Sequence, residues 1–262
     1  MRTLTYETIT FDLTDRVATL AIDRPARMNA LTPRVFADLT AGIDAALEQG
    51  ARAIVLTGTG AAFCSGADLV GDGGAPPSDL GEALDTSYNP FVRKVAALDV
   101  PFLTAINGPA VGAGLGLALL GDISVMARSA YLLLAFVNIG LVPDAGATWL
   151  VAKAVGRTKA LEMALLGEKV DADAAHHAGL VTRIADDGMV LHEAQRLAAK
   201  LAAGPSVAIG MIRKQVAAAL STDLEQSLAI ERENQTRAGY TRDFAEAVQA
   251  FGEKRKPEFE GR

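Results

Sequence analysis

The stretch PFLTAINGPAVGAGLGLALLGD, residues 101–122, decides the fold class of this chain. Its opening apolar run predicts a buried strand, its glycines predict a tight turn, and the apolar residues after them predict a helix. Upstream, residues 53–69, AIVLTGTGAAFCSGADL, show the same order of strand, glycine-bearing turn and helix. This repetition favours an α/β layout with largely parallel, buried strands.

Further elements flank these two units. Residues 6–13 and 17–24 alternate polar and apolar side chains, which predicts two strands joined by a turn. A helix is expected between Thr32, as its N-cap, and Gly50. Residues 70–90 are rich in Gly, Pro, Asp and Ser, which predicts a long flexible loop.

The hydrophobic pattern changes towards the C-terminus. We expect a core over residues 1–190 and a helical region over residues 191–262. The second region has helical periodicity throughout, in about four amphipathic helices.

Composition and charge exclude several classes of protein. The chain has 262 residues, of which 50% are hydrophobic, so it can bury a sizeable core and is not disordered. A formal net charge of −6 leaves no excess of cations for a nucleic-acid backbone. The single cysteine, Cys64, excludes an internal disulfide and a cysteine-based zinc site, and we expect no metal.

The chain shows no membrane or export pattern. Its longest apolar stretch, residues 111–120, contains three glycines and falls short of a membrane span. The N-terminus alternates polar and apolar residues, unlike a secretory leader. We therefore expect a cytoplasmic protein.

The two glycine-bearing turns stand directly before helices, where free backbone N–H groups can bind an anion or a carbonyl oxygen. Residues 112–116, GAGLG, lack the GxGxxG spacing of a dinucleotide site, and the chain has no GxxxxGK[ST] motif. Two interpretations stay open from the residues alone. In one, the glycines only allow close packing of strands and helices; in the other, two N–H groups form an oxyanion hole.

Asp144 lies in the apolar stretch FVNIGLVPDAGATWL, residues 136–150. By itself the pattern favours a helix N-cap, because an aspartate that follows Pro143 and precedes an apolar helical pattern is typical of that position.

Several segments, in order and over nearly the whole chain, resemble the crotonase, or enoyl-CoA hydratase/isomerase, superfamily. They are IDRPARMNAL, FCSGADL, PFLTAINGPAVGAGLGLAL, IGLVPDAGATWL, AHHAGLVTRI and FGEKRKPEF. The resemblance implies an α/β spiral of repeated ββα units with a C-terminal helical trimerisation region. It also implies a homotrimer or a dimer of trimers.

The resemblance implies the chemistry as well. Family members bind acyl-CoA thioesters and stabilise a thioester enolate with two backbone N–H groups, which match those of Ala67 and Ala113. The second position is commonly glycine, and alanine retains the N–H. Coenzyme A enters as part of the substrate, so no separate cofactor is implied, and neither a nucleic acid nor a membrane is expected as a partner.

Five residues match the coenzyme site of the family. Arg24, Ala26 and Arg27 match the segment that surrounds the adenine and phosphates. Phe251 and Lys254 match a C-terminal pair that completes the pocket, usually from a neighbouring subunit.

Hydratases of the family carry two glutamates, whose positions match Gly116 and Phe136. Neither of these residues can bind or deprotonate a water. Isomerases place one acidic residue in the turn that here holds Asp144, and one carboxylate suffices to move a proton between C2 and C4. We therefore expect an enoyl-CoA isomerase, similar around Asp144 to the isomerases that act on 1,2-epoxyphenylacetyl-CoA in phenylacetate degradation. Two alternatives stay open: an enoyl-CoA hydratase of the fatty-acid oxidation type, and a non-catalytic acyl-CoA-binding protein.

Overall fold

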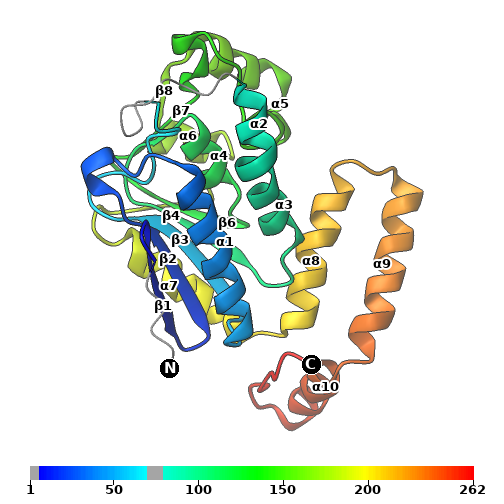
Figure 1. Cartoon of the computed structure of the whole chain (residues 1–262). Coiled ribbons are helices and arrows are strands. Elements are labelled where there is room, and N and C mark those ends of the chain that lie inside the picture. The colour runs from blue at the N-terminus through cyan, green and yellow to red at the C-terminus, as the bar shows by residue number, and fades with distance from the viewer. Residues whose placement is uncertain (1–5, 70–78) are drawn as a thin grey trace.

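Two sheets form the framework of the protein (Figure 1). The computed structural model describes residues 6–69 and 79–262. The larger sheet has six strands in the order β1-β2-β3-β4-β6-β9, and the smaller has three in the order β5-β7-β8. The strands are β1 Ile9–Thr14, β2 Val17–Ile22, β3 Ala53–Gly58, β4 Phe102–Ile106, β5 Ala110–Val111, β6 Ile123–Ala127, β7 Tyr131–Leu133, β8 Lys169–Asp171 and β9 Arg183–Ala185.

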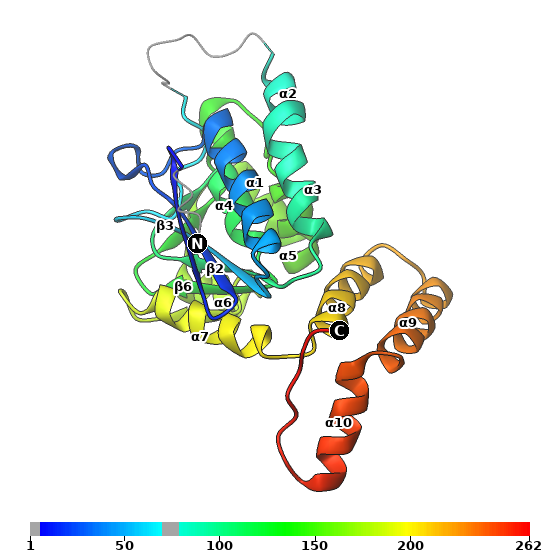
Figure 2. The ribbon, with the colours of Figure 1, turned by 60° about the horizontal axis from the view of Figure 1, so that its bottom comes forward.

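The larger sheet is parallel except at one edge. β1 and β2 form the antiparallel hairpin that their alternating sequences predict, and β2, β3, β4, β6 and β9 are parallel. Every residue of β3 and β4 is buried, because helices cover both faces of the sheet. Helix α1 (Pro33–Glu48) lies on one face and α7 (Val190–Ala202) on the other (Figure 2). The predicted α/β layout is confirmed.

Helix α1 begins where the sequence predicts. The Thr32 hydroxyl accepts a hydrogen bond from the Val35 N–H at 3.3 Å, and Pro33 occupies the first turn, where no N–H is needed. Its apolar side chains then repeat at helical spacing and pack on β1 and β2.

The remaining helices connect and extend the two sheets. They are α2 Leu80–Ala83, α3 Asn89–Ala97, α4 Ala113–Leu119, α5 Ala147–Leu166, α6 Ala172–His177, α8 Ser206–Ala219, α9 Leu224–Gly239 and α10 Arg242–Glu253, with short 3-10 segments η1 at Pro25–Arg27 and η3 at Ala135–Ile139.

The loop predicted over residues 70–90 is wrong for its second part. Residues 79–90 form α2, a π-helical turn at Leu84–Tyr88 and the start of α3. Asp79 caps this helical segment, since its side chain accepts hydrogen bonds from the N–H groups of the first turn. The first part of the predicted loop, residues 70–78, lies outside the described residues.

The C-terminal region contains the four helices that the periodicity predicts, α7 to α10. Helix α7 nevertheless packs on β2, β3, β4 and β6, because its apolar face covers the sheet. Helices α8, α9 and α10 stand away from the two sheets (Figures 1 and 2). By packing, α7 is part of the core, and α8 still contacts it, since Gly210 packs on the Asp99 backbone.

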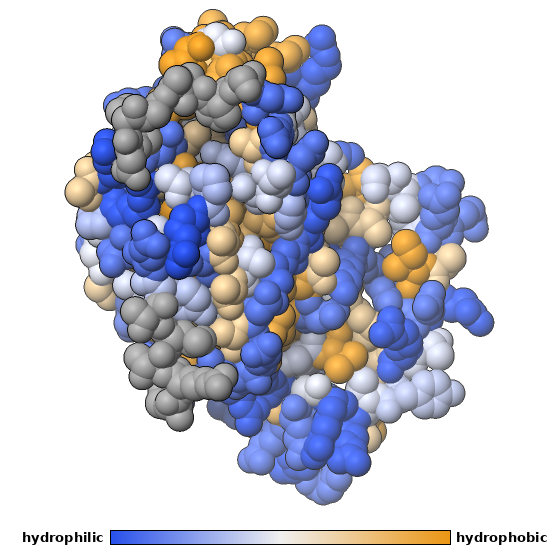
Figure 3. Space-filling model, in the orientation of Figure 1, coloured by the Kyte–Doolittle hydropathy of each residue, from blue (hydrophilic) through white to orange (hydrophobic). Residues whose placement is uncertain are grey.

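Apolar side chains also reach the surface. Figure 3 shows them gathered at the top of the molecule, over the η3 and α5 region, with separate patches over α8 and α9. The exposed apolar residues of these regions include Val137, Ile139, Val142, Leu165, Leu166, Ile212, Val216, Leu224 and Leu228. In the part of the chain that the structure describes, no helix is long and apolar enough to cross a bilayer.

Candidate active site

The two glycine-bearing turns lie against each other. Cys64 and Ala110 form a parallel bridge, in which the Val111 N–H donates to the Cys64 carbonyl oxygen at 2.9 Å. A Cβ atom on Gly66 would lie 2.9 Å from the Val111 oxygen and 3.7 Å from the Ala113 nitrogen. Gly66 also has a φ of +95°, so only glycine fits. The segment before Ala67 therefore packs directly on the N-terminus of α4.

The backbone N–H groups of Ala67 and Ala113 have no acceptor within residues 6–69 and 79–262. Ala67 pairs with Leu31, but the bonds of that pair run through the Gly66 carbonyl and the Asp68 N–H. Because successive N–H groups of an extended strand point to opposite sides, the Ala67 N–H points away from Leu31. Ala113 is the first residue of α4, where the N–H has no partner in the helix. With no acceptor among the described residues, both groups can donate to a ligand oxygen.

Asp144 lies in the turn between η3 and α5. Its Oδ1 is buried and is the one buried side-chain polar atom among the described residues that has no hydrogen-bond partner. Burial raises the pKa of this carboxyl from 3.8 to about 6. An aspartate with this pKa can both accept and return a proton near neutral pH.

The helix-capping interpretation of Asp144 is wrong. The N-cap of α5 is Gly146, with a φ of 77° and no side-chain hydrogen bond to the helix. The Asp144 backbone oxygen, and not its side chain, accepts from the Ala147 N–H at 2.8 Å. The carboxyl group therefore has no capping role.

The turn that holds Asp144 packs on helix α4. A Cβ atom on Gly116 would lie 2.7 Å from the Ala145 carbonyl oxygen and 3.0 Å from the Ala145 Cβ. Gly116 lies one helical turn after Ala113, so the contact holds Asp144 close to the helix end that carries one of the two free N–H groups. Ala145 itself has a φ of 50°, a left-handed conformation that costs energy for a residue with a side chain.

Neither position that matches a hydratase glutamate bears a carboxylate, and at Gly116 the fold leaves no room for one. Gly116 has no room for any side chain, as the distances to Ala145 show. Phe136 is buried, and its ring lies 3.8 Å from the point that a Cβ on Gly112 would occupy. An aromatic ring thus lies beside the paired turns, at the position that the sequence motifs match to a hydratase glutamate.

The residues predicted around the adenine and phosphates lie in and beside η1. Ala26 and Arg27 are exposed. Arg24 is instead engaged within the chain, since its guanidinium donates to the Ala30 carbonyl oxygen and forms an ion pair with Asp68 at 2.9 Å. Arg27 is therefore the more accessible of the two cations for a phosphate.

Phe251 and Lys254 lie at the end of α10, far from η1. Phe251 is 86% exposed, and Lys254 ends the helix in a left-handed conformation with φ of 58°. Figures 1 and 2 place α10 away from the loop after β2 in both views. Within one chain the structure does not bring the two parts of the predicted coenzyme site together.

Tyr88 is a buried group within electrostatic reach of Asp144, and the sequence prediction missed it. It ends the π-helical turn, is buried, and packs on Phe36 with ring centroids 4.4 Å apart and ring planes tilted by 47°. Burial raises the pKa of Tyr88, and the nearby charge of Asp144 raises it further. The signal was present: Tyr88, Phe91, Val92 and Val95 repeat at helical spacing, which predicts a buried helical face.

Cys64 lies beside the paired turns but is not available as a nucleophile. It is fully buried, and burial raises the pKa of its thiol to about 12. Its contacts are with the backbone of the turns: a Cβ on Gly114 would lie 2.8 Å from its sulfur. Cys64 fills space between the turns.

Known proteins resemble this chain over its full length. Residues 12–262 match the family model of enoyl-CoA hydratase/isomerase. A "Probable enoyl-CoA hydratase" of Rhodobacter capsulatus is 43% identical over 99% of this chain and 100% of its own. A 1,2-epoxyphenylacetyl-CoA isomerase of Escherichia coli is 40% identical over 94% of this chain and 95% of its own. The crystal structure of an enoyl-CoA hydratase from Bacillus anthracis has a TM-score of 0.92 at 28% identity and covers 98% of this chain and 100% of that one.

The two sheets, the C-terminal helices and the match to solved structures define the crotonase fold, as the sequence motifs predict. This chain belongs to the enoyl-CoA hydratase/isomerase family. It is thus a crotonase-family enzyme, a hydratase or an isomerase, whose family acts on acyl-CoA thioesters.

Proposed function

We propose that the protein is an enoyl-CoA isomerase in which Asp144 is the single acid/base. The observation that carries this proposal is the buried, unpartnered Oδ1 of Asp144, in a site where neither hydratase position bears a carboxylate. Isomerisation needs one group that removes and returns a proton, whereas hydration divides its proton transfers between two groups.

In the proposed mechanism the thioester oxygen accepts hydrogen bonds from the N–H groups of Ala67 and Ala113. Asp144 removes a proton from C2 of a 3-enoyl-CoA, and the negative charge of the dienolate rests mainly on the thioester oxygen. The two N–H groups stabilise that charge more strongly than the neutral carbonyl, which lowers the barrier. Protonated Asp144 then delivers the proton to C4 and gives the conjugated 2-enoyl-CoA, so no proton is gained or lost overall.

The test is conversion of a 3-enoyl-CoA to the 2-enoyl-CoA, followed through the absorbance of the conjugated thioester. Asp144→Asn should lower kcat by about 10²–10⁴-fold, the usual contribution of a positioned acid/base. Coenzyme A binding should be unchanged, which separates loss of chemistry from loss of the site. An Asp144→Asn enzyme with full activity would exclude this assignment.

Hydration is a second candidate, because the relative at 43% identity is named as a hydratase. In that case Asp144 would support water addition without a second carboxylate. Formation of 3-hydroxyacyl-CoA from crotonyl-CoA, faster than double-bond migration in 3-enoyl-CoA, would favour hydration. A non-catalytic acyl-CoA-binding protein would show neither product and no deuterium exchange at C2 or C4.

We also propose that the protein works as a homotrimer or a dimer of trimers. The support is that η1 and α10, which carry the two parts of the predicted coenzyme site, lie apart within one chain (Figure 2). Helices α8 and α9 also expose apolar side chains, including Ile212 and Leu228, which line one groove. In such an assembly Phe251 and Lys254 of one subunit would complete the site that Arg27 begins in the next.

A further inference from the structure

A buried arginine, Arg52, joins three segments that are far apart in the sequence. It lies just before β3, and its guanidinium donates to the Gly204 carbonyl oxygen at 2.6 Å and to the Ser206 hydroxyl at 2.6 Å. It also donates to the Phe259 carbonyl oxygen at 3.1 Å. The side chain is nearly inaccessible to water. Arg52 thus binds the linker between α7 and α8 and the C-terminal segment at the same time.

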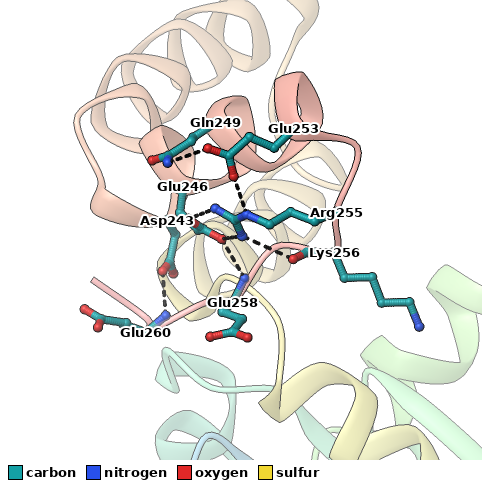
Figure 4. Close-up of polar contacts among 8 residues, drawn as sticks. All are labelled: Asp243, Glu246, Gln249, Glu253, Arg255, Lys256, Glu258 and Glu260. Carbon is teal, nitrogen blue, oxygen red and sulfur yellow. Dashed lines mark hydrogen bonds and ion pairs between the residues drawn. The ribbon is translucent and has the colours of Figure 1, made fainter.

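The C-terminal segment, residues 255–262, folds back along α10 (Figure 4). Asp243, at the start of α10, is buried and accepts hydrogen bonds from the N–H groups of Glu260 at 2.7 Å and Gly261 at 2.9 Å. Its own N–H donates to the Arg262 carbonyl oxygen at 3.1 Å.

A second set of contacts ties the same segment to the middle of α10. Glu246 accepts from the Glu258 N–H at 2.9 Å and forms an ion pair with Arg255. Figure 4 shows these side chains grouped on the side of α10 that faces the returning segment. The segment and α10 therefore form one unit, and a residue that fixes the segment also fixes the helix.

Arg52 holds both ends of the projecting region. Helices α8, α9 and α10 leave the core at Gly204 and return to it at Phe259, and both carbonyl oxygens bind this one guanidinium. Helix α8 is also tied to the core, since Arg213 pairs with Asp122 and donates to the Leu98 carbonyl oxygen. Beyond α8 few residues are buried among those described: α9 has none, and α10 has Asp243 and Ala250. A groove of about 510 Å³ lies beside the contact, and Arg16, Arg52 and Phe259 are among the residues that line it.

We propose that Arg52 is a positioning residue for coenzyme binding: by anchoring the C-terminal segment to the core it holds α10, and with it Phe251 and Lys254, in the place where they bind coenzyme A. This inference rests on the proposed coenzyme site. Its physical basis is preorganisation, because a helix that is already fixed loses less conformational freedom when the ligand binds. Arg52 lies far from Asp144 in the sequence and touches none of the proposed catalytic groups. Substitution of Arg52 should therefore leave the chemical step unchanged.

Two variants test the anchor from opposite sides. Arg52→Met removes the donors and keeps most of the apolar stem. Deletion of residues 259–262 removes the acceptor instead, together with the bonds of Glu260 and Gly261 to Asp243, so it tests the attachment of the whole segment while the core retains its arginine. Arg196→Met is the matched control, since this arginine is exposed and pairs only with Glu193 on its own helix among the described residues.

The measurements separate binding from chemistry. Both test variants should weaken binding of free coenzyme A in calorimetry by about tenfold, which is about 1.4 kcal/mol, and raise KM for the enoyl-CoA with kcat unchanged. KM for the corresponding enoyl-pantetheine, which lacks the nucleotide end, should not change, and Arg196→Met should match the wild type. Binding is measured on the fraction that elutes at the wild-type size.

The outcomes distinguish this inference from the proposed function. Wild-type protein that binds no coenzyme A would contradict the proposed site and the inference together. Wild-type binding with equal affinity in both variants would overturn the role of Arg52 alone. An equal rise of KM for enoyl-CoA and enoyl-pantetheine would also overturn it, because the damage would then extend beyond the nucleotide end.

Discussion

At the scale of single residues, Asp144 combines a position in the turn before α5 with a buried side-chain oxygen, and the sequence reveals only the first of these. Its position in the turn was predicted from motifs, but its environment was not: a carboxylate next to Pro143 could equally have capped α5. Burial of Oδ1 without a partner follows from the packing of the Asp144 turn against α4, a contact between segments that are distant in the chain. Sequence periodicity carries no information about such contacts.

The pKa of Asp144 predicts the pH dependence of turnover. The base must be ionised to remove a proton from C2, and burial sets its pKa at about 6. We expect kcat/KM for a 3-enoyl-CoA to be constant above pH 7 and to fall tenfold per pH unit well below pH 6. A pH–rate profile checks this. A profile that stays flat down to pH 4.5 would mean that Asp144 retains an ordinary aspartate pKa.

The same burial should lower stability at neutral pH. The folded-state pKa of Asp144 is raised above its ordinary value of 3.8, so the fold favours the neutral form and bears a cost whenever the group is ionised. This cost is fully present above pH 6 and disappears below pH 4. Asp144→Asn should therefore be more stable than the wild type at pH 8, by about 1–2 kcal/mol after allowance for partial exposure.

Urea unfolding of both proteins at pH 8 and pH 4 measures the difference. The stability gap should shrink to a small fraction at the lower pH, where wild-type Asp144 is neutral in the folded state and only partly ionised in the unfolded state. A gap of equal size at both values would assign the effect to packing and not to ionisation.

At the scale of secondary-structure elements, prediction succeeded where one local pattern dominates. The β1–β2 hairpin, α1 with its Thr32 cap and the four C-terminal helices follow from periodicity and capping residues. Prediction failed at residues 79–90, where polar composition suggested a loop although Tyr88, Phe91 and Val95 mark a buried helical face. Composition averages over a segment, whereas the helix is stabilised by a few apolar contacts.

The contact between α4 and the turn before α5 predicts a steric effect at Gly116. Gly116→Ala places a Cβ 2.7 Å from the Ala145 carbonyl oxygen, so the Asp144 turn must move. We expect a loss of about 1–3 kcal/mol in the free energy of unfolding, typical of overpacking, and a lower kcat with little change in KM. Unfolding curves and steady-state kinetics measure the two effects.

Gly239→Ala is the matched control for Gly116→Ala, since it makes the same substitution in another helix. Gly239 is the last residue of α9, and nothing lies within 4 Å of the place that its Cβ would occupy. This substitution should leave activity unchanged and keep or slightly raise stability, because alanine restricts the unfolded chain. A Gly116→Ala enzyme that behaves like Gly239→Ala would show that α4 and the turn can separate freely.

At the scale of the whole molecule, the arrangement of α8, α9 and α10 could not be predicted from the sequence. Their helical patterns were clear, but the pattern of α7 is equally amphipathic, and α7 packs on the sheet. The last three helices differ from α7 in following the linker at Gly204, which Arg52 binds through a long-range hydrogen bond. Arg52 also binds Phe259, and no local sequence pattern around this arginine predicts either contact.

The exposed apolar groove between α8 and α9 predicts how assembly affects the coenzyme site. Leu228 is about half exposed and lines this groove, so Leu228→Lys should shift the proposed trimer to monomers. KM for the enoyl-CoA should then rise, because Phe251 and Lys254 no longer reach the next subunit. Light scattering and kinetics measure both. Glu225→Lys, on the same helix, replaces one exposed charged side chain by another and should leave the trimer intact. A wild-type protein that is monomeric in light scattering would contradict the proposal.

The fit between Gly116 and Ala145 also restricts how this enzyme could change its reaction during evolution. A glutamate at position 116 is one of the two that a family hydratase uses, but here any side chain at that position meets the Ala145 backbone. The substitution becomes tolerable only after the turn has shifted, and a shift of the turn displaces Asp144. A first step towards a two-glutamate site at position 116 would therefore impair the proposed site of Asp144 before any second carboxylate could act.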